Sequence, residues 1–193
     1  MKREARQILL DSFGHAPRQL VGALRQFPKK MWLYKPSSER WSIHEIILHL
    51  ADSEAHSYIC CRRFIAEPGS AVFRIDGVRW AGSLGYFHQS TREALEVVRR
   101  LRRMTHQLLI SVPEAVWLQT VEHPREGRIS LERWLDRQAQ HIPHHVEQMR
   151  ANFELWLRTH PPRRPATRRQ ISELELASAE RRLDSASRVS AGC

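Results

Sequence analysis

Apolar residues recur every three to four positions in four long stretches of this chain, and few folds can bury such stretches. The clearest example runs from about Ser90 to Ser111. A repeat of this kind places the apolar side chains on one face of an α-helix, and that face must pack against another element. The apolar positions of this stretch are Ala94, Val97, Val98, Leu101, Met104, Leu108 and Leu109.

Capping residues and prolines define the ends of the four predicted helices. Ser42 followed by Glu45 is a capping-box pattern that begins the second helix, and Ser130 is a candidate N-cap for the fourth. Pro28 and Pro113 end the first and third helices. We predict helices over about Arg3–Phe27, which Gly14 could interrupt, and over about 42–66, 90–111 and 130–157.

Four amphipathic helices with polar connections predict an all-α fold, a four-helix bundle. No segment alternates convincingly with period two for long. The connection from about Glu67 to Gln89, between the second and third helices, is longer than most helix–helix loops. We predict that it forms a lid or a pocket wall. Its AVFRIDGVRW run is predicted to be a loop with local structure rather than a strand pair.

The chain changes character near residue 160. We predict a helical domain over residues 1–160 and a basic tail over residues 161–193. The tail is rich in Arg, Ser, Ala and Glu and contains no aromatic residue. It can therefore bury little apolar surface. We expect it to be flexible or marginally helical, and dispensable for the core.

The net charge of +10 raises the question of a nucleic-acid partner. Eight Arg and four acidic residues lie after Leu157, and the remaining excess is spread over the core without a basic run or interleaved aromatic residues. A solvated basic surface is the favoured interpretation, and a footprint for nucleic acid stays open.

The apolar runs and the cysteines bear on the compartment. No run approaches the roughly eighteen apolar residues that a membrane span needs, and no secretory signal is visible. Cys60 and Cys61 are adjacent and Cys193 is the last residue, which is neither a disulfide framework nor zinc-ligand spacing. We predict a cytoplasmic protein without a membrane segment.

Three histidines are candidate metal ligands. His141 and His145 lie four residues apart in HIPHH, so a helix places both rings on one face. His49 lies in the second predicted helix. Three neutral imidazoles around one divalent ion leave a coordination position open for water or substrate. A hydrogen-bonded polar core without a metal is the alternative that this spacing leaves open.

Polar residues share the faces of these histidines. On the fourth helix, Gln138 and Gln148 could bond the ring N–H groups or a bound water. On the second helix, Glu45 or Asp52 could accept the second ring N–H of His49. Asp52 could instead act as a general base on a metal-bound water.

Several motifs occur in a fixed order over roughly residues 15 to 157. They are Pro28, Trp32 and Pro36, then Trp41-Ser42-Ile43-His44-Glu45 and His49-Leu50-Ala51-Asp52-Ser53-Glu54, then Asp76, Trp80-Ala81 and Leu84-Gly85-Tyr86, and finally Ser130-Leu131, His141-Ile142-Pro143-His144-His145 and Gln148. This ordered combination resembles the DinB-like (damage-inducible, YfiT-related) family of four-helix metalloproteins.

The resemblance implies a bundle of four main helices that binds one divalent metal ion. The ligands would be His49 from the second helix and His141 and His145 from the last, with His56 and His144 as neighbours only. Zinc or nickel is the expected metal, with iron and manganese as the other candidates. Many members are homodimers, so a homodimer is expected. Some relatives resemble thiol-dependent S-transferases, and others look like hydrolases or isomerases.

We therefore predict a metal-dependent enzyme that activates a thiol or water toward a small-molecule substrate. The thiol would be a low-molecular-weight one, and Asp52 is the candidate catalytic residue. The Glu67–Gln89 connection, with Trp80 and Tyr86, would help to shape the substrate pocket, and a role of Trp80 as a core anchor is the alternative. The alternative is a non-enzymatic, stress-related binding protein with a structural or vestigial metal site and a basic tail that contacts nucleic acid.

Overall fold

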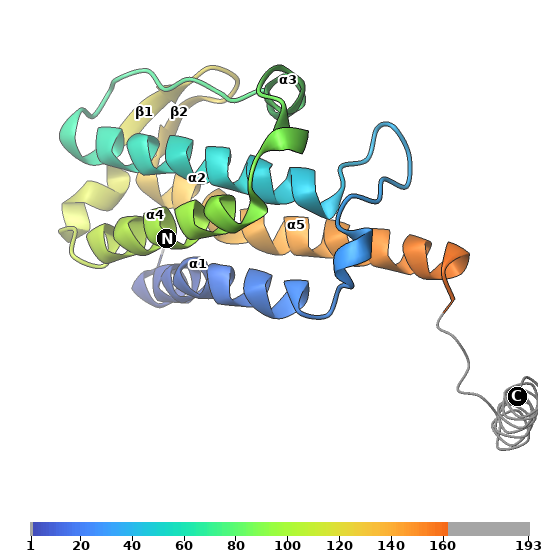
Figure 1. Cartoon of the computed structure of the whole chain (residues 1–193). Coiled ribbons are helices and arrows are strands. Elements are labelled where there is room, and N and C mark those ends of the chain that lie inside the picture. The colour runs from blue at the N-terminus through green and yellow to red at the C-terminus, as the bar shows by residue number, and fades with distance from the viewer. Residues whose placement is uncertain (1, 162–193) are drawn as a thin grey trace, which may run out of the picture. The chain divides into compact units, whose positions relative to one another are not determined.

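Four long helices form a bundle in the computed structural model, which describes residues 2–161 (Figure 1). Helix α1 packs mainly on α5, and α2 packs mainly on α4. The short helix α3 lies over α2. The helices of these residues are α1 (Arg3–Leu24), α2 (Ile43–Ala66), α3 (Gly77–Ser83), α4 (Thr91–Leu109) and α5 (Leu131–Thr159), with 3₁₀ turns at Lys29–Met31, Tyr86–His88 and Glu114–Leu118.

This arrangement confirms the predicted all-α four-helix bundle. The predicted tail, residues 161–193, lies outside the described residues apart from Pro161, so its flexibility and the division of the chain at residue 160 stay predictions. Among the described residues, every helix is too short or too polar to cross a membrane.

The long helices begin where the sequence predicts. The Glu45 amide donates to Ser42 Oγ over 3.2 Å, and the Ser42 amide donates to the Glu45 carboxylate over 2.8 Å, which completes the capping box. Ser130 Oγ accepts from the amide of Arg133 over 3.2 Å at the start of α5. Helix α1 runs without a break through Gly14 and ends at Leu24, three residues earlier than predicted.

A small hairpin between α4 and α5 was not predicted. Strands β1 (Thr120–His123) and β2 (Gly127–Ser130) pair antiparallel, with Val121 opposite Ile129 and both side chains buried. Four residues per strand are too few for a period-two pattern to stand out. Gly127 has a φ of +66°, which favours glycine at the entry to β2.

The long connection between α2 and α4 contains more order than its sequence indicates. The Val72 amide donates to the Glu122 carbonyl over 2.9 Å, which ties the start of the connection to β1. Asp76 then caps α3 by accepting from the Arg79 amide over 3.1 Å. The predicted loop with local structure is therefore correct, and its local structure is mainly helix α3.

The buried apolar side chains form two groups, one toward each end of the bundle. On α2, the first group ends at Ala51 and the second begins at Cys60. On α4, the first ends at Val98 and the second is reached at Leu109. Buried polar residues occupy the positions between the two groups.

Arg102 and Glu54 form a buried ion pair in this polar layer, with side chains 0% and 1% exposed. Arg102 Nε donates to Glu54 Oε2 over 2.9 Å, and Arg102 Nη2 donates to Glu54 Oε1. Arg102 Nη1 also donates to the Gln138 carbonyl over 3.1 Å, and the guanidinium carbon lies 3.9 Å from the ring centroid of Phe13. One side chain of α4 therefore contacts α1, α2 and α5.

We expect Arg102→Met to destabilise the protein by about 3–5 kcal/mol, because it leaves the Glu54 carboxylate buried without its partner. Urea unfolding measures the change. The double variant Arg102→Met/Glu54→Leu should be more stable than Arg102→Met, since no unpaired charge remains. Glu96→Gln, which breaks two exposed ion pairs of the same helix, should leave the unfolding midpoint unchanged. If Arg102→Met were as stable as the wild type, the buried ion pair would not stabilise the bundle.

Candidate metal centre

His49 of α2 comes together with His141 and His145 of α5. Each ring offers one nitrogen, and these three nitrogens lie within 4.8 Å of one another. The ring centroids of the three pairs are 4.7, 4.9 and 5.5 Å apart. His56 and His144, which the resemblance implied to be neighbours and not ligands, lie outside this group. The structure thus joins the three histidines that were predicted as ligands.

The Nε2 atoms of His141 and His145 have the spacing of two ligands on one divalent metal ion. His141 Nε2 and His145 Nε2 are 3.2 Å apart, and two nitrogens of a tetrahedral zinc site lie roughly 3.3 Å apart when each is about 2.0–2.1 Å from the ion. The Nδ1 atoms of His49 and His141 are buried and have no hydrogen-bond partner within residues 2–161. Buried polar atoms normally have partners, so the described residues leave this cluster only partly satisfied.

Burial keeps the three rings neutral. Burial, together with the smaller effect of the nearby His145, lowers the pKa of His49 to about 3. Burial likewise lowers the pKa of His145 to about 4 and that of His141 well below its usual value. The Arg102 cation adds to the effect on His141. All three imidazoles are therefore in the form that binds metal at neutral pH.

Gln148 orients one of the rings. His145 Nδ1 donates to Gln148 Oε1 over 2.8 Å, which leaves His145 Nε2 to face His141. The predicted contact between Gln148 and a histidine is thus present. Gln138 differs from the prediction, because its Oε1 accepts from Ser57 Oγ over 2.9 Å.

Neither carboxylate that was predicted to support His49 bonds to that ring. Glu45 serves the capping box and also accepts from Lys35 Nζ over 2.8 Å. The polar neighbour of His49 is Ser53, whose Oγ lies 3.4 Å from His49 Nε2. Asp52 does not belong to the group of ligand atoms.

Asp52 instead joins α2 to the turn Tyr86–His88. Its carboxylate accepts a hydrogen bond from the Tyr86 hydroxyl. Burial, this hydrogen bond and the Asp52 charge raise the pKa of Tyr86 well above its usual value, so the phenol stays a donor. His44 Nε2 lies 2.8 Å from the Tyr86 carbonyl oxygen and ties the same turn to α2. The catalytic role of Asp52 stays a prediction.

Trp41 and Gly77 pack against the histidine cluster, and neither was predicted as a site residue. The Trp41 ring centroid lies 4.6 Å from that of His49 and 6.3 Å from that of His145. A Cβ added at Gly77, the first residue of α3, would lie 2.9 Å from Trp41 Cη2 and 3.0 Å from His49 Nδ1. Only glycine lets α3 approach the histidines this closely.

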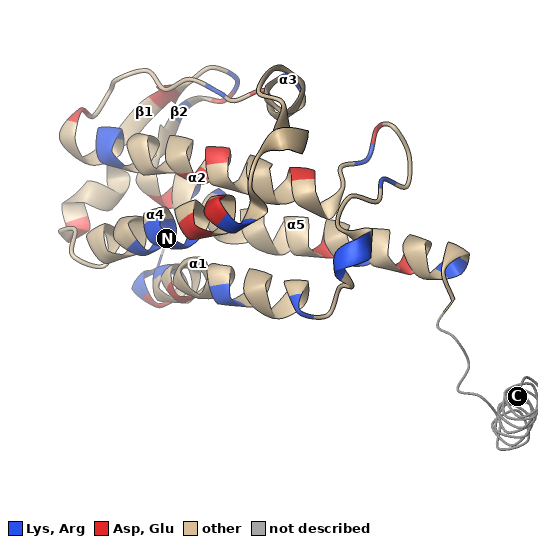
Figure 2. Cartoon of the chain, in the orientation of Figure 1, with Lys and Arg blue, Asp and Glu red and all other residues tan. Residues whose placement is uncertain are grey.

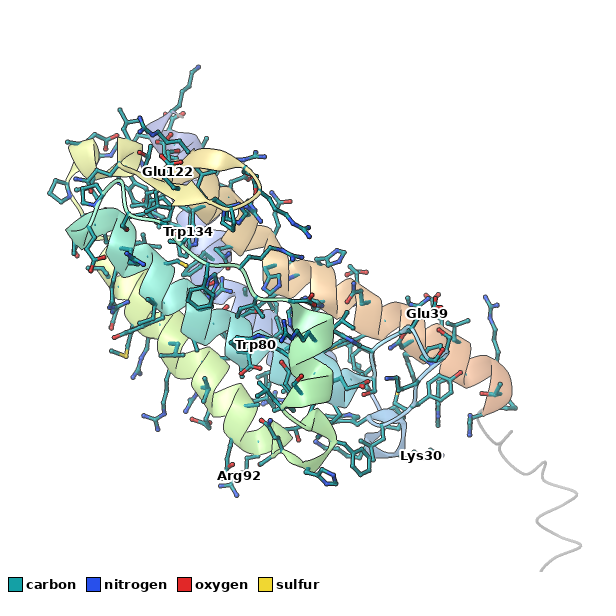
Figure 3. The ribbon with its side chains drawn as sticks, turned by 90° about the horizontal axis from the view of Figure 1, so that it is seen from above. Lys30, Glu39, Trp80, Arg92, Glu122 and Trp134 are labelled. Atoms are coloured by element: carbon teal, nitrogen blue, oxygen red, sulfur yellow. The ribbon has the colours of Figure 1, made fainter. Side chains whose placement is uncertain are left out.

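A cavity of about 410 Å³ opens beside His145. Trp80 and Tyr86, which were expected to shape the substrate pocket, do not line it. Tyr86 is buried against Asp52, and Trp80 lies on α3 over α2 (Figure 3). The cavity is lined by Glu39, Arg40, Trp41, Ile46, Val78, His145, Gln148 and Asn152.

The family described as DinB superfamily matches residues 12–149 of the chain. This range contains all three clustered histidines. The Oceanobacillus iheyensis protein named "Putative metal-dependent hydrolase OB0782" is 27% identical over 106 residues, which are 55% of this chain and 61% of that protein. The chain therefore matches less than two thirds of the length of this relative.

YfiT from Bacillus subtilis has a similar structure and is described as "a probable metal-dependent hydrolase with an unusual four-helix bundle topology". The TM-score is 0.74, over 83% of this chain and 90% of that one, at 20% sequence identity. The two proteins share the four-helix bundle fold.

We expect Gly77→Ala to weaken metal binding by about tenfold, a typical effect of disturbing the residues behind a metal ligand. The added Cβ would push α3 away from His49 and Trp41. Gly82→Ala is the matched control, because a Cβ at this position of the same helix meets nothing within 4 Å. Competition with a chelating dye measures both affinities, and equal affinities would contradict the role of Gly77.

We expect the metal-free protein to lose stability as the pH falls from about 6.5. The pKa values of His49 and His145 are about 3 and about 4 when folded, against 6.5 for an unperturbed histidine. Between these values the unfolded chain binds more protons, so acid favours unfolding, and the stabilisation is complete only above pH 6.5. Urea unfolding with EDTA at pH 7 and pH 5 measures the loss. The loss of stability between pH 7 and pH 5 should be smaller for His49→Gln than for the wild type. Equal losses would refute the role of His49 in this pH dependence.

Proposed function

The chain belongs to the DinB superfamily, and we propose that it is an enzyme that uses one divalent metal ion to activate water for the hydrolysis of a small molecule. The observation that carries the proposal is the cluster of three buried, neutral imidazoles. The names of the relatives from Oceanobacillus iheyensis and Bacillus subtilis favour hydrolysis.

In this proposal His49, His141 and His145 hold the ion. Their three ligand nitrogens lie within 4.8 Å of one another, and a set of imidazole donors suits zinc, nickel and iron. We propose zinc or nickel as the metal, with iron or manganese as the other candidates. Bound to three histidines, such an ion would lower the pKa of a nucleophile in its open position and supply it in ionised form near neutral pH.

Residues of the chain prepare the site for this chemistry. Gln148 holds the His145 ring in position, and the Arg102 charge disfavours protonation of His141. Trp41 and Gly77 pack against the rings and limit the access of bulk water. The adjacent cavity of about 410 Å³ suits a small molecule rather than a polymer. Its exposed Glu39 and Arg40 offer charges of both signs to polar substrate groups.

A thiol in place of water is the second form of the proposal, and it corresponds to an S-transferase. Burial raises the pKa of Cys60 to about 11 and that of Cys61 to about 12, so neither supplies a thiolate near neutral pH. The thiol would therefore come from a low-molecular-weight cosubstrate. Turnover of an electrophile that requires an added thiol would favour this form, and turnover in water alone would favour hydrolysis. The predicted homodimer and cytoplasmic location remain predictions.

We expect about one metal ion per chain in the wild-type protein and almost none in His145→Ala, because two imidazoles cannot complete the site. Mass spectrometry measures the metal content of tag-free protein after incubation with zinc, nickel or manganese salts and desalting. His144→Ala is the matched control, since His144 neighbours His145 on α5 but lies outside the cluster, and it should keep the ion. Absence of metal from the wild type, or its retention by His145→Ala, would sink the proposal.

A further inference from the structure

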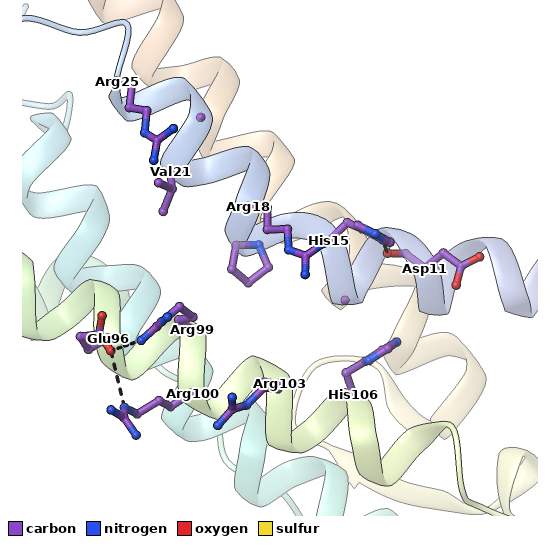
Figure 4. A pocket seen from close by; sticks show the side chains of 13 residues that line it. Asp11, His15, Arg18, Val21, Arg25, Glu96, Arg99, Arg100, Arg103 and His106 are labelled. Carbon is purple, nitrogen blue, oxygen red and sulfur yellow. Dashed lines mark hydrogen bonds and ion pairs between the residues drawn. The ribbon is translucent and has the colours of Figure 1, made fainter.

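A second and larger cavity lies between α1 and α4, where these two helices face each other (Figure 4). Its volume is about 930 Å³, more than twice that of the cavity beside His145. The space exists because α1 packs mainly on α5, while α4 packs mainly on α2. We call it the α1/α4 groove, and its lining residues on both helices are shown in Figure 4.

Arginine is the most frequent residue in the lining of the α1/α4 groove. Side chains from both helices lie along the space between them (Figure 4), and basic residues mark both α1 and α4 in Figure 2. The positive charges outnumber the negative ones by three, with the histidines neutral. The charged side chains are Arg18 and Arg25 from α1, Arg99, Arg100 and Arg103 from α4, and the two acids Asp11 and Glu96.

The excess charge is not neutralised by the fold. Glu96 forms ion pairs with Arg99 over 2.6 Å and with Arg100 over 3.5 Å. In contrast, Arg18, Arg25 and Arg103 have no acidic partner within residues 2–161. Like charges that face each other across a groove repel, and a bound anion would remove this repulsion.

Small residues of α1 keep the groove open. A Cβ at Gly22 would meet nothing within 4 Å, so the groove is free of side chains at this point. At Gly14 the opposite holds, because a Cβ there would lie 2.8 Å from His106 Nε2. The groove is therefore open at Gly22 and is closed by His106 of α4 beside Gly14.

The length of the groove indicates which kind of anion it can bind. Arg18 and Arg25 are seven residues apart, which is about 10 Å along a helix. A single phosphate or carboxylate would pair with only one end of this row. A nucleic-acid strand carries one charge per about 3.4 Å of axis, so about three charges match the excess over this length. Guanidinium groups bind phosphate oxygens in pairs of parallel hydrogen bonds.

We propose that the α1/α4 groove binds a chain of consecutive phosphates, either the backbone of a nucleic-acid strand or the polyphosphate of a small molecule. No Phe, Tyr or Trp lines the groove, so bases have no ring on which to stack. Recognition is thus independent of base sequence. This site is separate from the histidine cluster, whose residues do not line the groove.

Binding of a fluorescein-labelled oligothymidine to the full-length protein tests the proposal. The variant Arg18→Gln/Arg25→Gln/Arg103→Gln removes the three unpaired charges. It should weaken binding by at least about tenfold and reduce the slope of log affinity against log salt by about 2, at roughly 0.7 per lost phosphate contact. The matched control Arg74→Gln/Arg79→Gln/Arg125→Gln removes as many exposed charges elsewhere and should bind within about twofold of the wild type.

A variant without a charge change separates a groove from a diffuse basic surface. Gly22→Met should fill the groove and weaken binding as much as the arginine variant, while the helix gains a better helix former. Circular dichroism checks that the variant is folded. Equal loss in the two triple variants, or wild-type binding by Gly22→Met, would overturn the proposal and attribute binding to the overall charge.

Competition with inorganic tripolyphosphate distinguishes the two sources of phosphate. If tripolyphosphate displaces the labelled strand from the wild type at constant ionic strength, the ligand of the groove is a short polyphosphate. Resistance to displacement assigns an extended phosphodiester strand. Failure of both probes to bind at low salt would overturn the proposal for either source.

Discussion

The ion pair between Arg102 and Glu54 connects the whole bundle. It lies between two separate groups of apolar side chains, and Arg102 contacts α1, α2 and α5 from its place on α4. Burying two charges is tolerated here because the carboxylate and the guanidinium satisfy each other and a backbone carbonyl takes a further N–H. The pair also specifies how far α4 may slide along its neighbours. Its charge acts on the histidine cluster as well, since Arg102 helps to lower the pKa of His141.

The histidine cluster is costly for the fold in the absence of a metal. The buried Nδ1 atoms of His49 and His141 have no hydrogen-bond partner within residues 2–161, and an unsatisfied buried polar atom costs about 1–3 kcal/mol. A ligand that binds only the folded state stabilises that state. Metal binding and stability are therefore coupled in our proposal. The α1/α4 groove is similar, but its unsatisfied groups are charges. Its lining contains more arginines than acidic residues, so a bound anion would stabilise the folded state.

The features that depend on residues close together in the sequence could be predicted. Ser42, Glu45 and Ser130 mark helix starts through bonds to amides three residues away. The spacing of His141 and His145 needs only one helix. His49 was a candidate from its place in a second predicted helix, and the resemblance to DinB-like proteins joined it to the same site. The pocket was harder to predict: Trp80 and Tyr86 were expected to line it, whereas Glu39, Arg40 and Val78 do so. These residues come from two separate segments, and no periodicity connects them.

The order of elements and the helix faces follow from neighbours in sequence, because helical hydrogen bonds and caps act over three or four residues. The amphipathic pattern likewise requires that the helices pack together. It does not say which faces meet, how closely α3 approaches His49, or that α1 and α4 leave a groove between them. Those features depend on packing between residues far apart in the chain. Gly77 illustrates the difference, since its missing Cβ matters only where Trp41 and His49 are folded against it.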